Sequence, residues 1–371
     1  MEEKYMKQAI ALAKKGAGYV NPNPCVGAVI VKEGKIIGAG YHVAYGLAHA
    51  ERVALAHCKE SSKGAEMYVT LEPCCFYGKT PPCTEAIIES GIRKVYVGST
   101  DPNPKVAGKG LAMLQEQGIE VEVGLLKEEC EEMNRHFFHY IETKTPYVIM
   151  KYAMTMDGKI ATRMGESKWI TGKAARSKVH RDRHRYMGIM VGVGTILADD
   201  PSLNCRLETK EENPKPCQPI RIICDSNLRT PLEAKVVTSA RAQITILATA
   251  CRDKKRWQAY QERGCEILLL PKEKNHINLK ELMKELGKRG MDSVMLEGGR
   301  SLNGSFMDMG LVNRLQVYIG GKVFGANQAL SPIGGVGIDA PNQSLYLSAP
   351  KVTVLEEDVL IEREVISCLR E

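Results

Sequence analysis

Short apolar runs alternate with amphipathic segments along the first 145 residues of the chain. After an opening helix over residues 2–15, the pattern predicts strands and helices in turn. The expected strands are residues 26–31, 36–40, 67–71, 94–98 and 120–124, and the expected further helices are residues 49–57, 84–90, 107–116 and 127–142. Such an alternation is typical of a mainly parallel sheet covered on both faces, so we expect a three-layer α/β/α fold.

A break in this pattern near Thr143 to Pro146 indicates two domains, because a new apolar run begins at Tyr147. A chain of 371 residues also exceeds the size of a usual single core. We therefore expect one domain over residues 1–145 and a second over residues 146–371. No stretch is typical of a signal peptide or a membrane span, and the chain has twelve cysteines, so we expect reduced thiols in the cytoplasm and no membrane partner.

The net charge of +7 does not by itself select a partner. The lysines and arginines are spread along the chain without a dense basic run, which suits phosphorylated small molecules as well as nucleic acid. Only five Phe and two Trp are available to stack on bases. We therefore expect no nucleic-acid partner.

The first domain carries the residues of a zinc site. His49 is followed by Glu51, and then by Cys74 and Cys83. One imidazole and two thiolates make a three-ligand set that leaves a fourth position for water, as in catalytic zinc sites. A carboxylate two residues after the histidine is typical of zinc deaminases, where it moves protons without binding the metal. The sequence predicts His49, Cys74 and Cys83 as zinc ligands and Glu51 as the catalytic proton carrier.

The spacing of the two thiolates departs from the usual deaminase motif. Eight residues separate Cys74 from Cys83, where nucleoside and nucleic-acid deaminases have two. Gly78 and the Pro81-Pro82 pair permit the reversal that this longer loop needs. Cys75 remains an alternative fourth ligand, which would make the zinc structural.

Glycine-rich turns follow two apolar strands of the second domain. Gly192 to Thr195 follow the strand at residues 188–193, and Glu297 to Ser301 follow the strand at residues 293–296. Glycines at such places let backbone amides approach a pyrophosphate. A Rossmann fingerprint would need a third glycine where Leu197 stands, so a Rossmann fold is disfavoured. On spacing alone, these glycines could simply form turns and bind no ligand.

Motifs in both halves resemble the bifunctional riboflavin-biosynthesis deaminase-reductase family. They are Asn21 to Pro24, Val26 to Ala28, Thr70 to Cys74, Gly78 to Cys83, Asp101 to Pro104, Lys151, Asp157 to Ala161, Ser167 to Ile170, Gly192 to Thr195, Asp199 to Leu203 and Glu297 to Gly299. The resemblance covers nearly the whole chain. It implies a cytidine-deaminase-like domain followed by a dihydrofolate-reductase-like α/β domain that uses NADPH.

The resemblance also implies site residues. Those that would hold the deaminase substrate are Asn23, His42, Lys79, Asp101 and Asn103. Those that would contact NADPH are Ala153, Trp169, Thr195, Asp199, Ser226, Gly298, Gly299, Arg300 and Ser301. Those that would hold the reductase substrate are Lys151, Ser167, Arg183, Leu203, Arg206 and Glu297. An arginine guanidinium can donate two parallel hydrogen bonds to a phosphate, and a carboxylate can accept hydrogen bonds from ring N–H groups.

The implied function is a pair of consecutive reactions. The first is zinc-dependent hydrolytic deamination of 2,5-diamino-6-(5-phosphoribosylamino)pyrimidin-4(3H)-one, and the second is NADPH-dependent reduction of its ribosyl group to ribityl, carried out by a homo-oligomer. Two alternatives stay open. One is a tRNA or DNA base deaminase whose basic C-terminal domain grips the polynucleotide, and the other is a metabolite-sensing protein with structural zinc.

Overall fold

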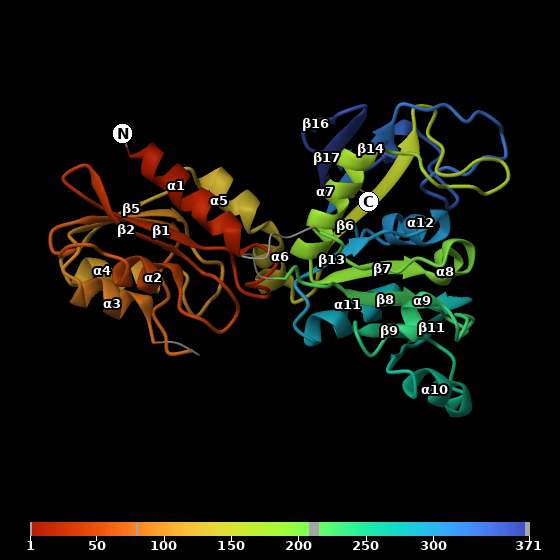
Figure 1. Ribbon diagram of the computed structural model, residues 1–371, viewed down its shortest axis with the longest axis horizontal. Helices are drawn as coiled ribbons and strands as arrows, with labels where there is room; N and C mark the ends of the chain where they lie inside the picture. The colour runs from red at the N-terminus through yellow and green to blue at the C-terminus, as the bar shows by residue number, and fades with distance from the viewer. Residues whose placement is uncertain (1, 79–80, 208–214, 368–371) are drawn as a thin grey trace. The chain divides into compact units, whose positions relative to one another are not determined.

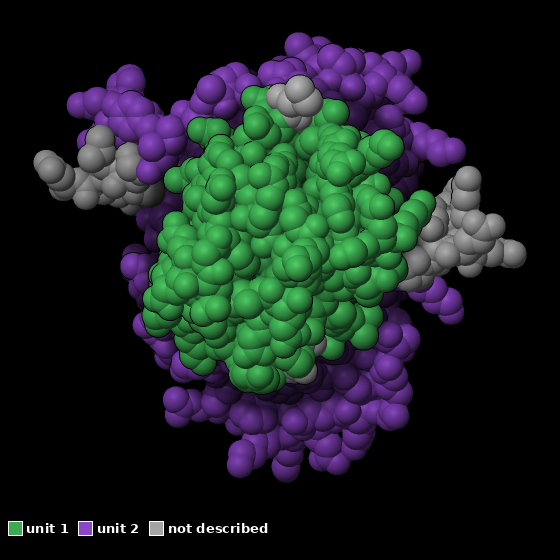
Figure 2. Space-filling model, turned by 90° about the vertical axis from the view of Figure 1, so that its left-hand side faces the viewer, with its two compact units in different colours: residues 1–144 green, residues 145–371 purple. Residues whose placement is uncertain are grey.

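The computed structural model describes residues 2–78, 81–207 and 215–367. The chain divides into two compact units, Met1–Lys144 and Thr145–Glu371, which are coloured separately in Figure 2. The division falls one residue from the expected boundary. Within the described residues, every helix falls short of the length and apolar character that a membrane crossing requires.

Unit 1 is built on one sheet with helices on both faces (Figure 1). Its strands are β1 (Gly27–Lys32), β2 (Lys35–Tyr41), β3 (Glu66–Leu71), β4 (Lys94–Ser99) and β5 (Glu120–Val123). Its helices are α1 (Glu3–Ala13), α2 (Ala50–Ala56), α3 (Cys83–Glu89), α4 (Lys109–Glu116), α5 (Lys127–Met133) and α6 (Arg135–Thr143), with a 3₁₀ turn at Lys14–Gly16.

Alternating strand residues explain the two covered faces of this sheet. In β3, Met67 and Val69 pack in one core with residues of α2, α3 and α4, whereas Tyr68 packs in a second core with residues of α1 and α5. Successive strand side chains point to opposite faces, so an unbroken apolar run needs a helix layer on each side. The three-layer α/β/α architecture is confirmed.

The sheet of unit 1 has most of its strands in one direction, as expected, but β1 runs the other way. Its order is β2-β1-β3-β4-β5, with β3, β4 and β5 parallel, but β1 runs antiparallel to both β2 and β3. The tight turn at Glu33 and Gly34, both at positive φ, joins β1 to β2 as a hairpin. A connection this short forces antiparallel pairing.

The helix expected over residues 127–142 is also interrupted. It breaks at Asn134, which is fully buried and separates α5 from α6. The Asn134 side chain accepts a hydrogen bond from the backbone N of Cys25 at 2.8 Å and donates one to the Cys25 carbonyl at 2.9 Å. The buried backbone groups of Cys25 need hydrogen-bond partners, and Asn134 supplies them from a distant part of the chain. The helical pattern of residues 127–142 gives no sign of this long-range contact.

Unit 2 contains a larger sheet and its own helices. Its strands are β6 (Tyr147–Thr155), β7 (Gly188–Gly192), β8 (Ile220–Cys224), β9 (Thr245–Thr249), β10 (Glu266–Leu269), β11 (Lys272–Glu273), β12 (His276–Ile277), β13 (Ser293–Leu296), β14 (Arg314–Gly320), β15 (Tyr346–Leu347), β16 (Lys351–Leu355) and β17 (Asp358–Ser367). Its helices are α7 (Lys173–Arg185), α8 (Val193–Asp199), α9 (Lys235–Thr238), α10 (Lys254–Gln261), α11 (Leu279–Lys288) and α12 (Arg300–Asp308), with a 3₁₀ turn at Pro341–Gln343.

The strand order of unit 2 brings distant segments together. The order is β10-β9-β8-β7-β13-β6-β14-β17-β15, and β16 pairs with β17. From β10 to β14 all neighbours are parallel, while β17 is antiparallel to its neighbours. Because β13 lies between β7 and β6, the carboxyl ends of these three strands meet at one edge. Ligands bind at this edge in open α/β sheets.

Candidate active sites

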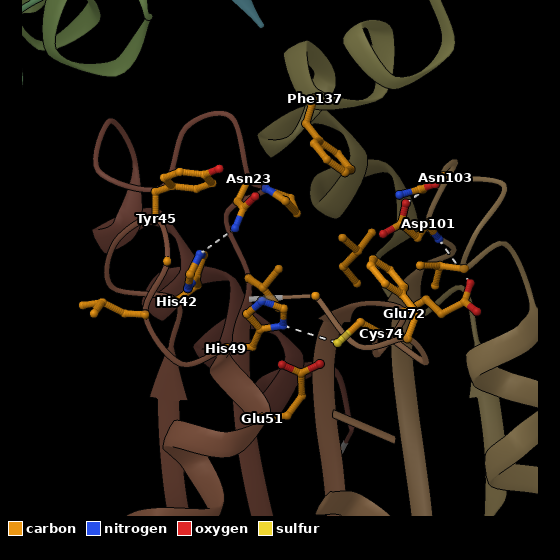
Figure 3. Close-up of a pocket in the computed structure, with 18 residues that line it drawn as sticks. Asn23, His42, Tyr45, His49, Glu51, Glu72, Cys74, Asp101, Asn103 and Phe137 are labelled. Atoms are coloured by element: carbon orange, nitrogen blue, oxygen red, sulfur yellow. Dashed lines mark hydrogen bonds between the residues drawn. The ribbon is translucent and has the colours of Figure 1, made fainter. Parts of the chain in front are cut away.

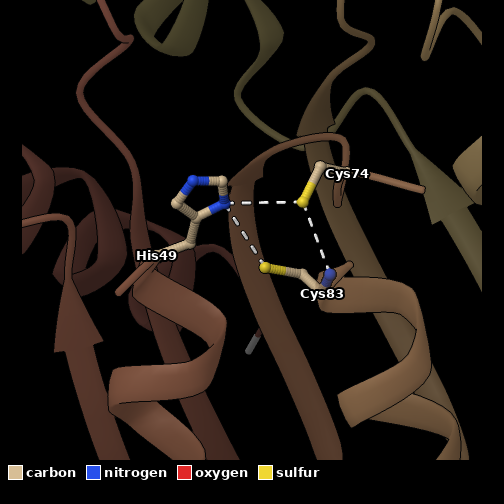
Figure 4. A group of neighbouring side chains, drawn as sticks. All are labelled: His49, Cys74 and Cys83. Carbon is tan, nitrogen blue, oxygen red and sulfur yellow. Dashed lines mark hydrogen bonds between the residues drawn. The ribbon is translucent and has the colours of Figure 1, made fainter. Parts of the chain in front are cut away.

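Three predicted zinc ligands converge in unit 1 at junctions between strands and helices (Figure 4). His49 is the residue directly before α2, Cys74 follows β3, and Cys83 is the first residue of α3. One possible ligand atom from each residue lies within 4.8 Å of the other two. The backbone N of Cys83 donates to the Cys74 carbonyl at 3.0 Å, which holds the ends of the long loop together.

The donor set suits a zinc ion. His49 Nδ1 lies 3.4 Å from Cys74 Sγ and 3.5 Å from Cys83 Sγ, so one ring nitrogen faces both sulfurs. Hydrogen bonding with Cys83 lowers the pKa of the Cys74 thiol to about 4, and the same pairing raises the pKa of Cys83. Nitrogen and thiolate donors gathered in this way are the ligands that zinc prefers.

Glu51 lies beside this cluster on the first turn of α2. Its side chain is 3% exposed, and burial raises the pKa of its carboxyl group to about 7. Within the described residues its Oε2 has no hydrogen-bond partner. A buried carboxyl with an open oxygen is well suited to exchange protons near neutral pH.

The long loop between the two cysteines is fastened by Arg52. Its guanidinium donates to the carbonyls of Pro81 and Pro82 at 3.2 and 2.8 Å. Cys75 lies outside the ligand cluster, because its Sγ donates to the Lys105 carbonyl at 3.6 Å. The arrangement therefore favours three protein ligands over four. Lys79 lies outside the described residues.

A pocket of about 270 Å³ opens over the cluster, as Figure 3 shows. Asn23 and His42 form part of its wall, with Asn23 Nδ2 and His42 Nε2 3.2 Å apart. His42 Nδ1 lies 3.1 Å from the carbonyl of Ala48, which can only accept, so Nδ1 carries the proton and Nε2 accepts from Asn23. Burial lowers the pKa of His42, which favours this neutral form.

Asp101 and Asn103 line the same pocket on a loop after β4. Asp101 Oδ1 accepts from the backbone N of Asn103 at 2.8 Å, and Asn103 Oδ1 accepts from the backbone N of Lys105 at 3.1 Å. Burial raises the pKa of Asp101 to about 6. The structure thus brings the described residues that were predicted to hold the deaminase substrate to one cavity with Glu51.

Sequence reasoning missed the apolar walls of this pocket. Tyr45, Phe76 and Phe137 all line it, together with Glu72. Phe76 stands two residues after Cys74, so its nearness to the motif was a usable signal. Tyr45 and Phe137 reach the pocket from a loop after β2 and from α6, and only the fold unites them.

In unit 2, an ion cluster forms where β13 ends beside the middle of β6. Glu297 accepts from Arg183 Nε at 2.7 Å and from Arg183 Nη2 at 3.0 Å, and Lys151 Nζ lies 3.6 Å from its Oε2. Burial alone would raise the pKa of Glu297, but Arg183 and Lys151 lower it to about 2. The Arg183 guanidinium, which was expected to bind the pyrimidine or its ribose phosphate, thus donates its hydrogen bonds to the Glu297 carboxylate.

Arg206 joins this cluster through Asn204. Arg183 donates to the Asn204 carbonyl at 3.1 Å, and Arg206 donates to Asn204 Oδ1 at 2.9 Å. His180, which the sequence did not single out, accepts from the backbone N of Arg206 at 3.2 Å. Burial, followed by Arg183 and Arg206, lowers the pKa of His180 to about 4, so its ring is neutral and can accept.

Two expected contacts have their side chains engaged elsewhere. Leu203, at φ 50°, buries its side chain in the core with Ile189 and Val191, so only its backbone is left to meet a ligand. The Ser226 hydroxyl accepts from the backbone N of Ile277 at 3.0 Å. The predicted ligand contacts of these two residues stay predictions.

The remaining expected contacts lie near the carboxyl ends of the strands. Ser167 donates to Asp199 at 3.2 Å, and Trp169 is 58% exposed with the Arg176 guanidinium 4.6 Å from its ring centre. Gly298 and Gly299 lead directly into α12, whose first residues are Arg300 and Ser301. A Cβ atom on Gly299 would lie 3.4 Å from Thr195 Oγ1, so the two glycine-rich turns are neighbours. Ala153 lies on β6 beside β14.

Family comparisons match each unit separately. Residues 1–99 match the cytidine and deoxycytidylate deaminase zinc-binding region, and residues 146–361 match the RibD C-terminal domain. The fold and the two sites therefore define a zinc-binding deaminase joined to an NADPH-dependent reductase.

Relatives of this combined architecture cover nearly the whole chain. The riboflavin biosynthesis protein RibD of Actinobacillus pleuropneumoniae is 51% identical over 98% of this chain and 96% of its own length. The RibD protein of Aquifex aeolicus is 45% identical over 97% of this chain and 98% of its own length. The chain belongs to the RibD family, whose members are bifunctional enzymes of riboflavin biosynthesis and act on a phosphoribosylated pyrimidine.

Solved structures agree with this assignment. One form of Acinetobacter baumannii RibD has a TM-score of 0.88 at 35% identity and covers 99% of both chains. A Thermotoga maritima protein, named diaminohydroxyphosphoribosylaminopyrimidine deaminase/5-amino-6-(5-phosphoribosylamino)uracil reductase, has a TM-score of 0.86 at 37% identity over 98% of both chains. Neither the nucleic-acid deaminase nor the metabolite sensor is favoured by these comparisons.

Proposed function

We propose that the two activities are divided between the units, with deamination in residues 1–145 and reduction in residues 146–371. The observation that carries this division is the presence of one candidate site in each unit, each made only of that unit's residues. The order of reactions follows the family, with deamination first.

His49, Cys74 and Cys83 would hold the zinc ion of the deaminase. When bound, zinc supplies a water molecule whose pKa is lowered to about 7 and which serves as the nucleophile. The donor set and the nearby open oxygen of Glu51 support this assignment.

Glu51 is the proton carrier of the reaction. Its carboxylate accepts one proton from the attacking water and passes it to the ring nitrogen as the adduct forms. It then accepts the second water-derived proton from the hydroxyl of the adduct and passes it to the amino group, which leaves as ammonia while the carbonyl forms. A pKa near 7 allows both steps at neutral pH. The side chain is confined on α2, so it is already positioned before the substrate arrives.

The pocket residues would orient the pyrimidine and its sugar. Because Asn23 turns Nδ2 towards His42, its Oδ1 is left to accept from an amino or ring N–H group. Asp101 and Asn103 would face the ribose, and Lys79 would pair with the phosphate. The aromatic walls of the pocket provide apolar area for the ring.

In unit 2, NADPH would lie along the glycine-rich turns. When bound, NADPH supplies the hydride that reduces the ribosyl C1′ carbon and opens the sugar to ribityl. Gly298 and Gly299 admit close approach, and the N-terminus of α12 at Arg300 and Ser301 favours a phosphate group. The expected contacts Ala153, Trp169, Thr195, Asp199 and Ser226 stay predictions.

The ion cluster would hold the reductase substrate. Lys151 is the candidate proton donor to the opening sugar, and Glu297, 3.6 Å away, would orient its ammonium group. Arg206, which is exposed, is free to meet the substrate phosphate, while Arg183 orients Glu297. Ser167 and the backbone of Leu203 would complete this side of the site.

A paired assay on purified protein tests the proposal. Zinc bound at one equivalent per chain, ammonia release from the diaminopyrimidine substrate, and NADPH oxidation that depends on the deaminated product are all expected. Zinc removal should abolish ammonia release and spare NADPH oxidation. Loss of both activities on zinc removal would contradict separate sites.

Assembly into a homo-oligomer, the absence of a nucleic-acid partner and residence in the cytoplasm stay predictions. Light scattering on the purified chain measures the first, and a binding titration with tRNA measures the second.

A further inference from the structure

Glu72 is a buried carboxylate that the proposed chemistry does not use. It stands between the end of β3 and the ligand Cys74, lines the deaminase pocket and is 4% exposed. Figure 3 shows it on the same side of the pocket as Asp101 and Asn103. A carboxylate taken out of water in this way must be stabilised by hydrogen-bond donors.

Three backbone N–H groups supply this stabilisation. Glu72 Oε2 accepts from the N of Asp101 at 3.2 Å and from the N of Gly108 at 3.0 Å, and Oε1 accepts from the N of Gly110 at 3.1 Å. All three donors lie in segment 101–110, which begins at Asp101 and ends in the first turn of α4. Hydrogen bonds to a charged acceptor are about twice as strong as neutral ones.

The same contact places a negative charge at the start of α4. Gly108 is the residue directly before the helix and Gly110 is in its first turn. Unpaired N–H groups give a helix N-terminus a partial positive charge, so the Glu72 side chain acts as a cap donated by another element.

The backbones are also in close contact at this point. A Cβ atom on Gly110 would lie 2.3 Å from the Pro73 carbonyl oxygen and 3.3 Å from Glu72 Oε1. Only a glycine therefore lets α4 approach the Glu72-Pro73 segment this closely. The contact is short, direct and adjacent in sequence to Cys74.

The polar side chains of segment 101–110 form hydrogen bonds with backbone groups of the same segment. Asp101 accepts from the N of Asn103, Asn103 accepts from the N of Lys105, and the Asn103 carbonyl accepts from the N of Val106 at 2.8 Å. These local bonds define the shape of the loop but do not set its distance from the metal ligands. The bonds to Glu72 do so.

We propose that Glu72 is a positioning residue that holds segment 101–110 at a set distance from the zinc ligands and thereby determines the affinity of the deaminase for the ribosyl phosphate part of its substrate. This inference rests on the proposed function, in which Asp101 and Asn103 face the ribose. Glu72 acts through these two residues, because both of its oxygens are already engaged by backbone.

The variant Glu72→Gln tests this role in the full-length, zinc-loaded enzyme. An amide keeps the shape of the side chain, but its NH₂ group faces N–H donors where Oε2 now accepts two bonds. We expect the deaminase KM to rise about tenfold or more while kcat changes less than about threefold, since the interaction lost belongs to substrate binding. Zinc content should stay at one equivalent, and hydrogen exchange at the amides of Gly108 and Gly110 should accelerate.

Glu66→Gln is the matched control. Glu66 lies at the other end of the same strand, where it pairs with Arg93 and accepts from the Tyr68 hydroxyl at 3.2 Å. The chemical change is identical, so the deaminase KM and the exchange of segment 101–110 should stay as in the parent. If Glu72→Gln does not yield folded protein, Glu72→Asp keeps the charge but shortens the reach, and it should raise KM by a smaller factor.

Two results would overturn the inference. One is an unchanged KM in Glu72→Gln, and the other is a loss of zinc and of kcat at constant KM, which would make Glu72 a support of the metal site. The variants Asp101→Ala and Asn103→Ala separate this failure from failure of the proposed function. If they leave KM unchanged, the substrate assignment is wrong; if they raise it and Glu72→Gln does not, the positioning role is wrong.

Discussion

Two glutamates with little exposure, Glu51 in unit 1 and Glu297 in unit 2, have pKa values shifted in opposite directions. Glu51 is raised to a pKa of about 7 because burial dominates its surroundings, whereas Glu297 is lowered to about 2 because Arg183 and Lys151 overcome the same burial. The first carboxyl can therefore take up and release a proton near neutral pH, while the second stays ionised at neutral pH. The contrast shows how neighbouring cations decide whether a buried carboxyl carries protons or carries charge.

The strongest test of this contrast is Glu51→Gln. An amide cannot shuttle a proton, so deaminase kcat should fall about 10³-fold or more. Zinc content, measured by atomic absorption, should be unchanged, and reductase turnover should equal that of the parent. Retained ammonia release would remove Glu51 from the proton-carrying role.

The corresponding change in unit 2 is Glu297→Gln, whose main effect should come from the loss of the negative charge. Loss of the anion leaves Arg183 and Lys151 without their shared partner in a largely buried place. We expect reductase kcat/KM to fall about 10²-fold and the free energy of unfolding of unit 2 to fall by about 3 kcal/mol. Steady-state kinetics and urea unfolding measure the two effects.

Glu281→Gln is the control for that variant, because Glu281 pairs with Lys284 on an exposed helix surface. It should change neither quantity. A reductase loss in Glu297→Gln no greater than in the control would show that the anion is dispensable.

The pH dependence of stability sharpens the same comparison. The folded-state pKa of Glu297, about 2, lies below the ordinary value of 4.5, so its ionised form contributes stability above about pH 4.5 that is lost as the pH falls towards 2. The stability difference between the parent and Glu297→Gln should therefore shrink as the pH is lowered from 5 to 3. A difference that stays constant over this range would contradict the lowered pKa.

The smallest expected effect is that of Arg206→Ala. Its exposed guanidinium contacts Asn204 and is proposed to meet the substrate phosphate, so reductase KM should rise about tenfold. Deaminase KM, measured on the same preparation, should not change. Equal damage to both activities would break the separation of the two sites.

The two sites also differ in how far sequence could predict them. The candidate zinc site depends on residue types with special chemistry at short spacings, and His49, Glu51, Cys74 and Cys83 were predicted from those alone. The Glu297 cluster depends on a pairing across 114 residues, which follows from β13 lying between β7 and β6. The family resemblance indicated that Arg183 and Glu297 were substrate-site candidates, but not that they would bind each other.

By itself, the sequence predicted the alternation of strands and helices in the first domain, a break near residue 145 and a candidate zinc donor set of His49, Cys74 and Cys83. These depend on local periodicity and on ligand chemistry, both of which are written in neighbouring residues. Only the tertiary structure decided the antiparallel placement of β1, the helix break at Asn134, the burial of Leu203 and the capping of α4 by Glu72. Each of these is set by buried groups from distant segments that must satisfy one another, and that requirement exists only once the chain is packed.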